Sequence, residues 1–197
     1  TAQIAALNTA QLSGMDSSDF VALGTSQVAA LSTGQLRALG SDDIVALSTA
    51  QVAAMTTAQV AGLATSQIQA LETADIAALG TSRIAALSTA QFDALSSTQL
   101  AALSTTQLAG VSTAQMASLA TSDLASLSTT QFAALSTAQV AALGTAQVAN
   151  LETADLAVLS TAQLRGFSSA DIAALGTTQV VALTTTQVAG LSTTHVR

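Results

Sequence analysis

The sequence predicts an all-α solenoid of very short helices, with one helix in each eight-residue repeat. Three observations support this fold class. The chain of 197 residues is one octapeptide written twenty-four times without insertion or deletion, followed by five residues. The apolar residues of each octad have helical spacing, and a helix-capping pattern recurs at the joints. Repetition at a short fixed period is typical of a stack in which each unit contacts only its neighbours.

The consensus octad reads [TS]-x-[QD]-[apolar]-x-[small]-L-x, as in residues 137–144, TAQVAALG. We number its positions as slots one to eight. Slot one is Thr or Ser, slot four is a large apolar residue, and slot seven is Leu in most octads. Slot three is Gln or Asp except at Arg83 and His195. Slot five accepts charged residues such as Arg37 and Asp93, which predicts that it faces solvent.

The spacing of the apolar slots favours a separate helix in each octad over one continuous helix. Slots four and seven lie three residues apart, so both fall on one helix face. That face would rotate by roughly 80° per octad, and a continuous helix would wind its apolar stripe around its own axis. We therefore expect helices of about six or seven residues that are stable only when stacked. Slots four and seven should be buried throughout, and the small slot six should allow close helix approach.

Capping signals mark the joints between helices. In residues 31–36, LSTGQL, Ser32 can cap the following helix and Gln35 completes a capping box. Leu31 and Leu36 can form the accompanying hydrophobic staple. An alternative places the cap one residue later, on the slot-one Thr or Ser. The helix breaks are accordingly expected in slots eight and one.

We expect residues 1–197 to form a single continuous repeat array. Thr1 and Thr193 both occupy slot one, so the chain starts and stops in phase, and we expect it to be part of a longer protein. The intervals between the slot-six glycines are multiples of the octad length, which leaves coils of two or of three helices open.

Composition removes several classes of partner. Eleven acidic and four basic residues give a net charge of −7, and phosphate contacts need clustered basic residues, so no nucleic acid is expected. There is no Cys, which excludes disulfides and thiolate metal sites. Hydroxyl and Gln residues interrupt every apolar run well before the roughly 18 residues of a membrane span, so none is expected.

The sequence contains no predicted catalytic, cofactor-binding or metal-ligating residue, and we expect that the protein is not an enzyme and uses no cofactor. His195, the one histidine, is interpreted as a solvent-facing substitute for Gln. Asp42 and Asp43 are interpreted as a charged cap. The slot-three acids are interpreted as capping-box acceptors in preference to a calcium ladder; they are Asp19, Asp43, Asp75, Asp123, Asp155 and Asp171. The slot-one hydroxyls are interpreted as helix caps.

The tandem string [LM]-[ST]-T-x-Q-[VIL]-A-A-L, found for example at residues 135–143, resembles tracts in very large repetitive bacterial surface proteins of the adhesin-like or haemagglutinin-like type. The resemblance extends over the whole chain. It implies a Gram-negative bacterial origin, an extracellular or cell-surface location and a stalk or filament role. It carries over no functional residues.

Two classes of function remain. The first is a structural filament, stalk or spacer that associates with itself, because the first and last octads look like interior ones and unprotected ends favour head-to-tail stacking. The second is a binding module that presents a repetitive Thr/Ser or Asp face to ice, polysaccharide or calcium.

Overall fold

The computed structural model describes residues 2–192, in which twenty-four short α-helices follow one another, one per octad, without a strand. The predicted all-α repeat solenoid is confirmed. No helix among these residues is long and apolar enough to cross a membrane. The chain divides into two compact units, residues 1–103 and residues 104–197. The single continuous array over residues 1–197 stays a prediction.

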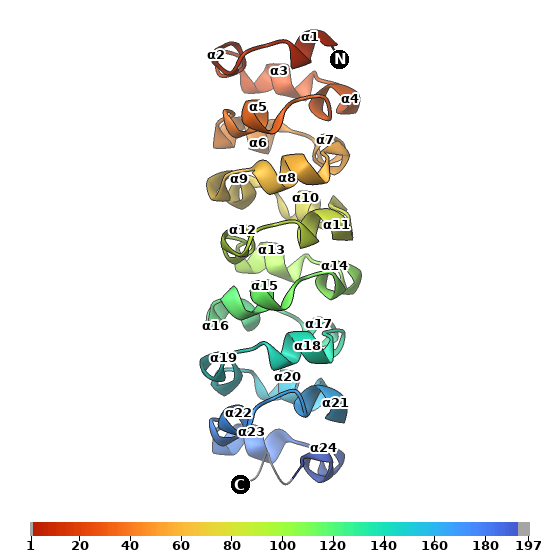
Figure 1. Ribbon diagram of the computed structural model, residues 1–197, viewed down its shortest axis with the longest axis vertical. Coiled ribbons are helices and arrows are strands. Elements are labelled where there is room, and N and C mark those ends of the chain that lie inside the picture. The colour runs from red at the N-terminus through yellow and green to blue at the C-terminus, as the bar shows by residue number, and fades with distance from the viewer. Residues whose placement is uncertain (1, 193–197) are drawn as a thin grey trace. The chain divides into compact units, whose positions relative to one another are not determined.

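The first unit contains thirteen helices (Figure 1). They are α1 (Ala2–Ala5), α2 (Thr9–Leu12), α3 (Ser17–Val21), α4 (Thr25–Val28), α5 (Thr33–Arg37), α6 (Ser41–Ala46), α7 (Thr49–Ala54), α8 (Thr57–Gly62), α9 (Thr65–Ala70), α10 (Thr73–Ala78), α11 (Thr81–Ala85), α12 (Thr89–Asp93) and α13 (Ser97–Ala101).

The second unit contains eleven helices of the same kind. They are α14 (Thr105–Ala109), α15 (Thr113–Ser118), α16 (Thr121–Leu124), α17 (Thr129–Ala133), α18 (Thr137–Ala141), α19 (Thr145–Ala149), α20 (Thr153–Val158), α21 (Thr161–Leu164), α22 (Ser169–Ala173), α23 (Thr177–Ala182) and α24 (Thr185–Gly190).

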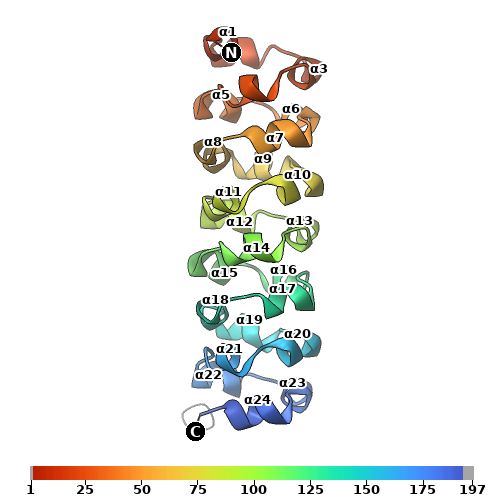
Figure 2. The ribbon, with the colours of Figure 1, turned by 90° about the vertical axis from the view of Figure 1, so that its right-hand side faces the viewer.

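Within each unit, the helices from α2 onward pack on helices three octads away. In the first unit α3 contacts α6 and α6 contacts α9; in the second, α17 contacts α20 and α20 contacts α23. Figure 2 shows α17, α20 and α23 one beneath another along one edge of the second unit. One coil therefore contains three helices, which decides between the two coil sizes that the sequence left open.

The helix breaks fall in slots seven and eight, one residue earlier than predicted. At the joint before α7, Leu47 and Ser48 are extended, with φ/ψ of −65°/132° and −67°/153°, and Thr49 is already the first helical residue. The cap is therefore the slot-eight residue and not the slot-one hydroxyl. Because slot seven has also left the helix, the helices have four to six residues instead of six or seven.

Slots four and seven form the core, as predicted, except at the ends of the chain. Slot-four side chains are buried from Ile4 to Leu164, and slot-seven side chains from Leu31 to Leu175. The prediction of burial throughout is wrong at Val188, which is 50% exposed, because no described coil follows to cover it. Slot five is exposed in nearly every octad, as predicted.

Slot six is the point of closest approach between stacked helices. A Cβ atom added to Gly62 of α8 would lie 3.0 Å from Cβ of Thr33, which belongs to the stacked helix α5. A Cβ atom on Gly190 would lie 2.8 Å from Cγ2 of Thr161, which has the same place on α21. The predicted role of small residues in slot six is confirmed at both positions.

Candidate functional site

The glutamines of slot three link successive coils. Oε1 of Gln51 accepts a hydrogen bond from the backbone N–H of Ser48 at 2.7 Å, at the start of its own helix. Its Nε2 donates to the carbonyl oxygens of Phe20 and Leu23, both at 2.7 Å. These carbonyls lie 31 and 28 residues earlier in the chain, at the end of α3.

The same geometry recurs in both units. In the second unit, Nε2 of Gln139 donates to the carbonyls of Leu108 and Val111 at 2.7 and 2.8 Å. We call this set the glutamine ladder; its members with such bonds include Gln35, Gln51, Gln59, Gln67, Gln91, Gln99, Gln139, Gln147, Gln163, Gln179 and Gln187.

The ladder satisfies backbone groups at both kinds of helix terminus. Helix ends leave N–H and C=O groups without partners inside the helix, and burying such groups unpaired costs free energy. Each amide uses its acceptor for the first N–H of one helix and its donor for the last carbonyls of the helix four octads earlier. The two helices lie on consecutive coils, so each ladder glutamine joins one coil to the next.

Sequence reasoning identified the capping half of this arrangement and missed the other half. It also treated slot three as solvent-facing when it interpreted His195, a residue that lies outside the described ones. Gln51 and Gln139 are each only 2% exposed. A signal was present: slot three never contains Glu, although Glu completes a capping box as well as Gln does and suits a helix N-terminus better. Only Gln adds the donor that the distant carbonyls need.

Arg83, which replaces glutamine in slot three of α11, has hydrogen-bond donors but no acceptor. Its Nε donates to the carbonyl of Met55, 28 residues earlier, at 2.5 Å. The guanidinium cannot accept from the backbone, and α11 accordingly lacks a capping box. Arg83 therefore occupies the ladder with a different side chain.

Two slot-three aspartates find donors in slot one. Oδ1 of Asp43 accepts from the hydroxyl of Ser17 at 3.0 Å, and Oδ1 of Asp171 accepts from the hydroxyl of Thr145 at 2.7 Å. Burial raises the pKa of Asp171, but hydrogen bonds from the Ser168 hydroxyl, the Thr145 hydroxyl and the Ser168 N–H outweigh it, and the net pKa lies below 3.8. Asp171 is therefore held as a carboxylate.

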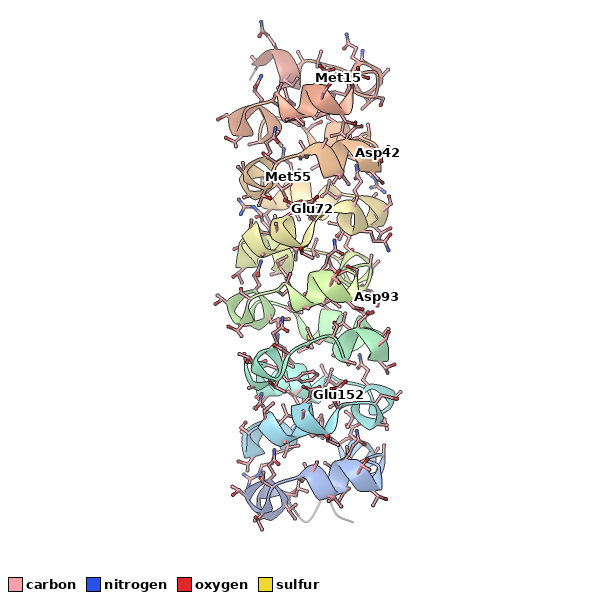
Figure 3. The ribbon with its side chains drawn as sticks, turned by 180° about the vertical axis from the view of Figure 1, so that it is seen from behind. Met15, Asp42, Met55, Glu72, Asp93 and Glu152 are labelled. Carbon is pink, nitrogen blue, oxygen red and sulfur yellow. The ribbon has the colours of Figure 1, made fainter. Side chains whose placement is uncertain are left out.

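Two other slot-three aspartates are poorly matched to their surroundings. Oδ2 of Asp75 accepts from the N–H of Glu72 at 3.0 Å, while its buried Oδ1 has no hydrogen-bond partner. Asp155 makes no capping bond, and burial, followed by the charge of Glu152, raises its pKa to about 6. Figure 3 labels Glu72 and Glu152, which are the cap residues of α10 and α20.

The capping interpretation of the slot-three acids is thus confirmed in part. The carboxylates of Asp19, Asp43, Asp75 and Asp171 accept from the N–H of the cap residue. The interpretation is wrong for Asp155, whose helix has no capping box. Asp123 lies half-buried in α16, which also lacks one.

The remaining candidates do not assemble into a site. Asp42 is exposed in the first turn of α6, beside the half-buried Asp43. Within residues 2–192, no group of three or more His, Cys, Asp or Glu side chains could hold a metal ion. An open groove of about 320 Å³ lies beside Arg37, Gly62 and Ser88 in the first unit. From Thr9 to Thr185 the slot-one residues are the first residues of their helices and not the caps, which corrects their predicted role.

Comparison with known proteins identifies the repeat. No curated protein matches the chain. The profile of the ALTTAQ repeat matches residues 1–33, 36–73, 68–105, 116–153, 148–185 and 169–197. The string ALSTAQ at residues 86–91 extends from slot six to slot three, and so covers the close approach, the helix joint and the ladder glutamine. Because these matches cover most of the sequence, the chain belongs to the ALTTAQ repeat family.

Proposed function

We propose that this protein is a structural element, and not an enzyme, that stacks end to end as an extracellular filament, stalk or spacer of a bacterium. The family match and the repeated coil support the structural role. The observation that carries self-association is the contact between coils, which uses groups that every octad repeats: the slot-three amide, two main-chain carbonyls and the apolar residues of slots four and seven.

The N-terminal face carries the donors. Gln11 and Gln27 accept from the cap N–H groups of Asn8 and Gly24, as ladder members do. Among the described residues, no carbonyl accepts a hydrogen bond from their Nε2 groups. Met15, labelled in Figure 3, is a half-buried slot-seven residue of the same face.

The C-terminal face carries the acceptors. Within the described residues, the last ladder glutamine, Gln187, reaches the carbonyls of Leu156 and Leu159. No described amide reaches the equivalent carbonyls of the following octads. Val180 and Val188, both in slot four, are 47% and 50% exposed there. A second copy whose first coil packs on this face would cover the valines and pair the carbonyls, a heterologous contact that propagates into a fibre.

Sedimentation velocity of the purified chain at micromolar concentration tests the proposal. We expect the wild-type chain to form polymers and Val180→Glu/Val188→Glu to stay monomeric, because the two carboxylates would be buried at the contact. Val181→Glu is the matched control, since Val181 is in slot five and 79% exposed. A monomeric wild-type chain would contradict self-association and leave the spacer role.

The cellular location needs a separate test. Protease treatment of intact bacteria that express the full gene product should cleave the repeat without lysis. Protection of the repeat until the cells are opened would contradict the extracellular location.

A further inference from the structure

Asp155 occupies slot three of α20, a position of the glutamine ladder, but its carboxylate lacks the N–H donor of a glutamine amide. The ladder register of 31 and 28 residues assigns to slot three of α20 the carbonyls of Leu124 and Leu127, at the end of α16. At the equivalent place one octad earlier, Gln147 donates to Met116 and Leu119 at 3.2 and 2.7 Å. An aspartate carboxylate can only accept, so neither carbonyl receives the side-chain donor that a ladder glutamine supplies, and the Leu124 carbonyl keeps only its bond from the backbone N–H of Leu127 at 3.0 Å.

The surroundings of Asp155 contain no positive charge to compensate. Asp155 is 3% exposed. Its helix packs against α17 and α23, which contain no titratable residue, and α16 adds only Asp123. The cap residue on its own joint is Glu152. Burial and neighbouring acids both favour the neutral form of a carboxyl group.

A neutral carboxyl group restores what the ladder requires. A carboxylic acid has one acceptor oxygen and one O–H donor, the same pair that a glutamine amide presents. When a proton binds one carboxyl oxygen, the resulting O–H would be the donor available to the carbonyls of Leu124 and Leu127. The ionised carboxylate has only hydrogen-bond acceptors, and so do the two carbonyl groups.

We propose that the joint around Asp155 is a proton-operated lock between two coils of the second unit, closed when Asp155 is neutral and loosened when it ionises. Asp171 is the built-in contrast, because three hydrogen bonds hold its carboxyl group in the charged form. Asp75 shows the same mismatch in the first unit, where its Oδ1 is buried without a partner.

The linkage has a definite sign. The pKa of Asp155 is about 6 in the folded chain against its ordinary value of 3.8, so the folded state binds the proton more tightly. The contribution to stability is complete below about pH 4 and is lost as the pH rises through 6. The shift corresponds to about a hundredfold change in the local opening equilibrium.

The test combines carboxyl ¹³C NMR titration with hydrogen exchange of the whole chain. We expect Asp155 to titrate near pH 6 and the α20 amides to open about a hundredfold more often at pH 7 than at pH 4, after correction for intrinsic exchange. Asp155→Gln should abolish this dependence and protect α20 at pH 7. Asp93→Gln, which removes an exposed charge, should leave it unchanged.

Two outcomes would overturn the proposal. One is a titration of Asp155 near pH 4 with the α20 dependence unaltered in Asp155→Gln. The other is a dependence that millimolar Ca²⁺ removes and EDTA restores, which would assign the joint to a metal cation in place of a proton.

Discussion

At the scale of the residue, slot three decides how well each coil joins the next. Glutamine supplies an acceptor and a donor at once, and the structure uses both in a buried position. Its replacements divide by what they lack: Arg83 lacks the acceptor, and the aspartates lack the donor. The residues on either side of the joint then determine whether an aspartate is satisfied, as Asp171 is, or mismatched, as Asp155 is.

Removing one ladder amide should be costly. Gln139→Ala removes the partner of the Ser136 N–H and of the Val111 carbonyl, while the Leu108 carbonyl keeps only its bond from the Val111 N–H, and we expect a loss of roughly 2–4 kcal/mol in the stability of the second unit. Urea unfolding followed by circular dichroism measures it. Gln69→Ala, which truncates an exposed slot-five side chain, should change stability by less than about 0.5 kcal/mol. Equal losses for the two variants would show that the ladder bonds add nothing.

The pH dependence of stability that we expect from Asp171 has the opposite sign to that expected from Asp155. Its folded pKa is lowered, so its contribution to stability is present above about pH 4 and disappears as the pH falls through the folded value. Thr145→Val removes one donor to the carboxylate. We expect this variant to begin acid unfolding at a higher pH than the wild type, as followed by far-UV circular dichroism between pH 5 and 2. An unchanged acid transition would contradict the assignment.

At the scale of the element, each helix is too short to be stable alone and depends on its cap and its stacking partner. The slot-eight residue caps the start of each helix, and the preceding helix has already ended at slot four, five or six. The apolar pair in slots four and seven then packs against the helices of the neighbouring coils. Slot six sets how closely those helices approach.

Because α8 and α5 approach closely at Gly62, a larger side chain at this position should destabilise the fold. Gly62→Val would force its side chain against Thr33 of α5, and we expect a destabilisation of roughly 1–3 kcal/mol. Thr33→Ala should restore part of the loss, which a double-mutant cycle would detect. Gly34→Val is the control, because no atom lies within 4 Å of its added Cβ. Additive effects of Gly62→Val and Thr33→Ala would contradict the contact.

The core slots predict a contrast between two residues that lie two apart in the sequence, at the end of α13 and just after it. Leu103 is 3% exposed, so Leu103→Ala should cost roughly 2–5 kcal/mol. Ala101 is an exposed slot-five residue, and Ala101→Glu should cost little. Thermal unfolding of the two variants measures the difference. A large loss from Ala101→Glu would place slot five inside the core.

At the scale of the whole molecule, the proposed stacking depends on burial more than on charge. The chain has only four basic residues, and its end faces present Val, Leu and amide groups. We therefore expect the sedimentation profile of the polymers to change little between 50 mM and 500 mM salt. Dissolution of the polymers by salt alone would show that ion pairs hold the contact.

Much of the fold could be predicted from the sequence because the relevant forces are local. The cap at Ser48 and the burial of Val52 follow from residues within one octad. The burial of Gln51 and the three-helix coil could not be predicted, because they depend on contacts with residues three or four octads away. The mismatch at Asp155 was missed for the same reason: its missing partners are carbonyl groups, which every residue type carries.

The register of the ladder also has a genetic consequence. Each glutamine recognises main-chain carbonyls at a fixed number of octads, and main-chain groups are the same in every octad. Unequal recombination can add or delete the codons of one whole octad. Each glutamine amide would then meet an equivalent pair of main-chain carbonyls, and the coil would stay intact. Loss of a few codons within one octad would instead misplace the bonds across several neighbouring octads. The coding sequence can thus lengthen or shorten in steps of one repeat while the fold persists.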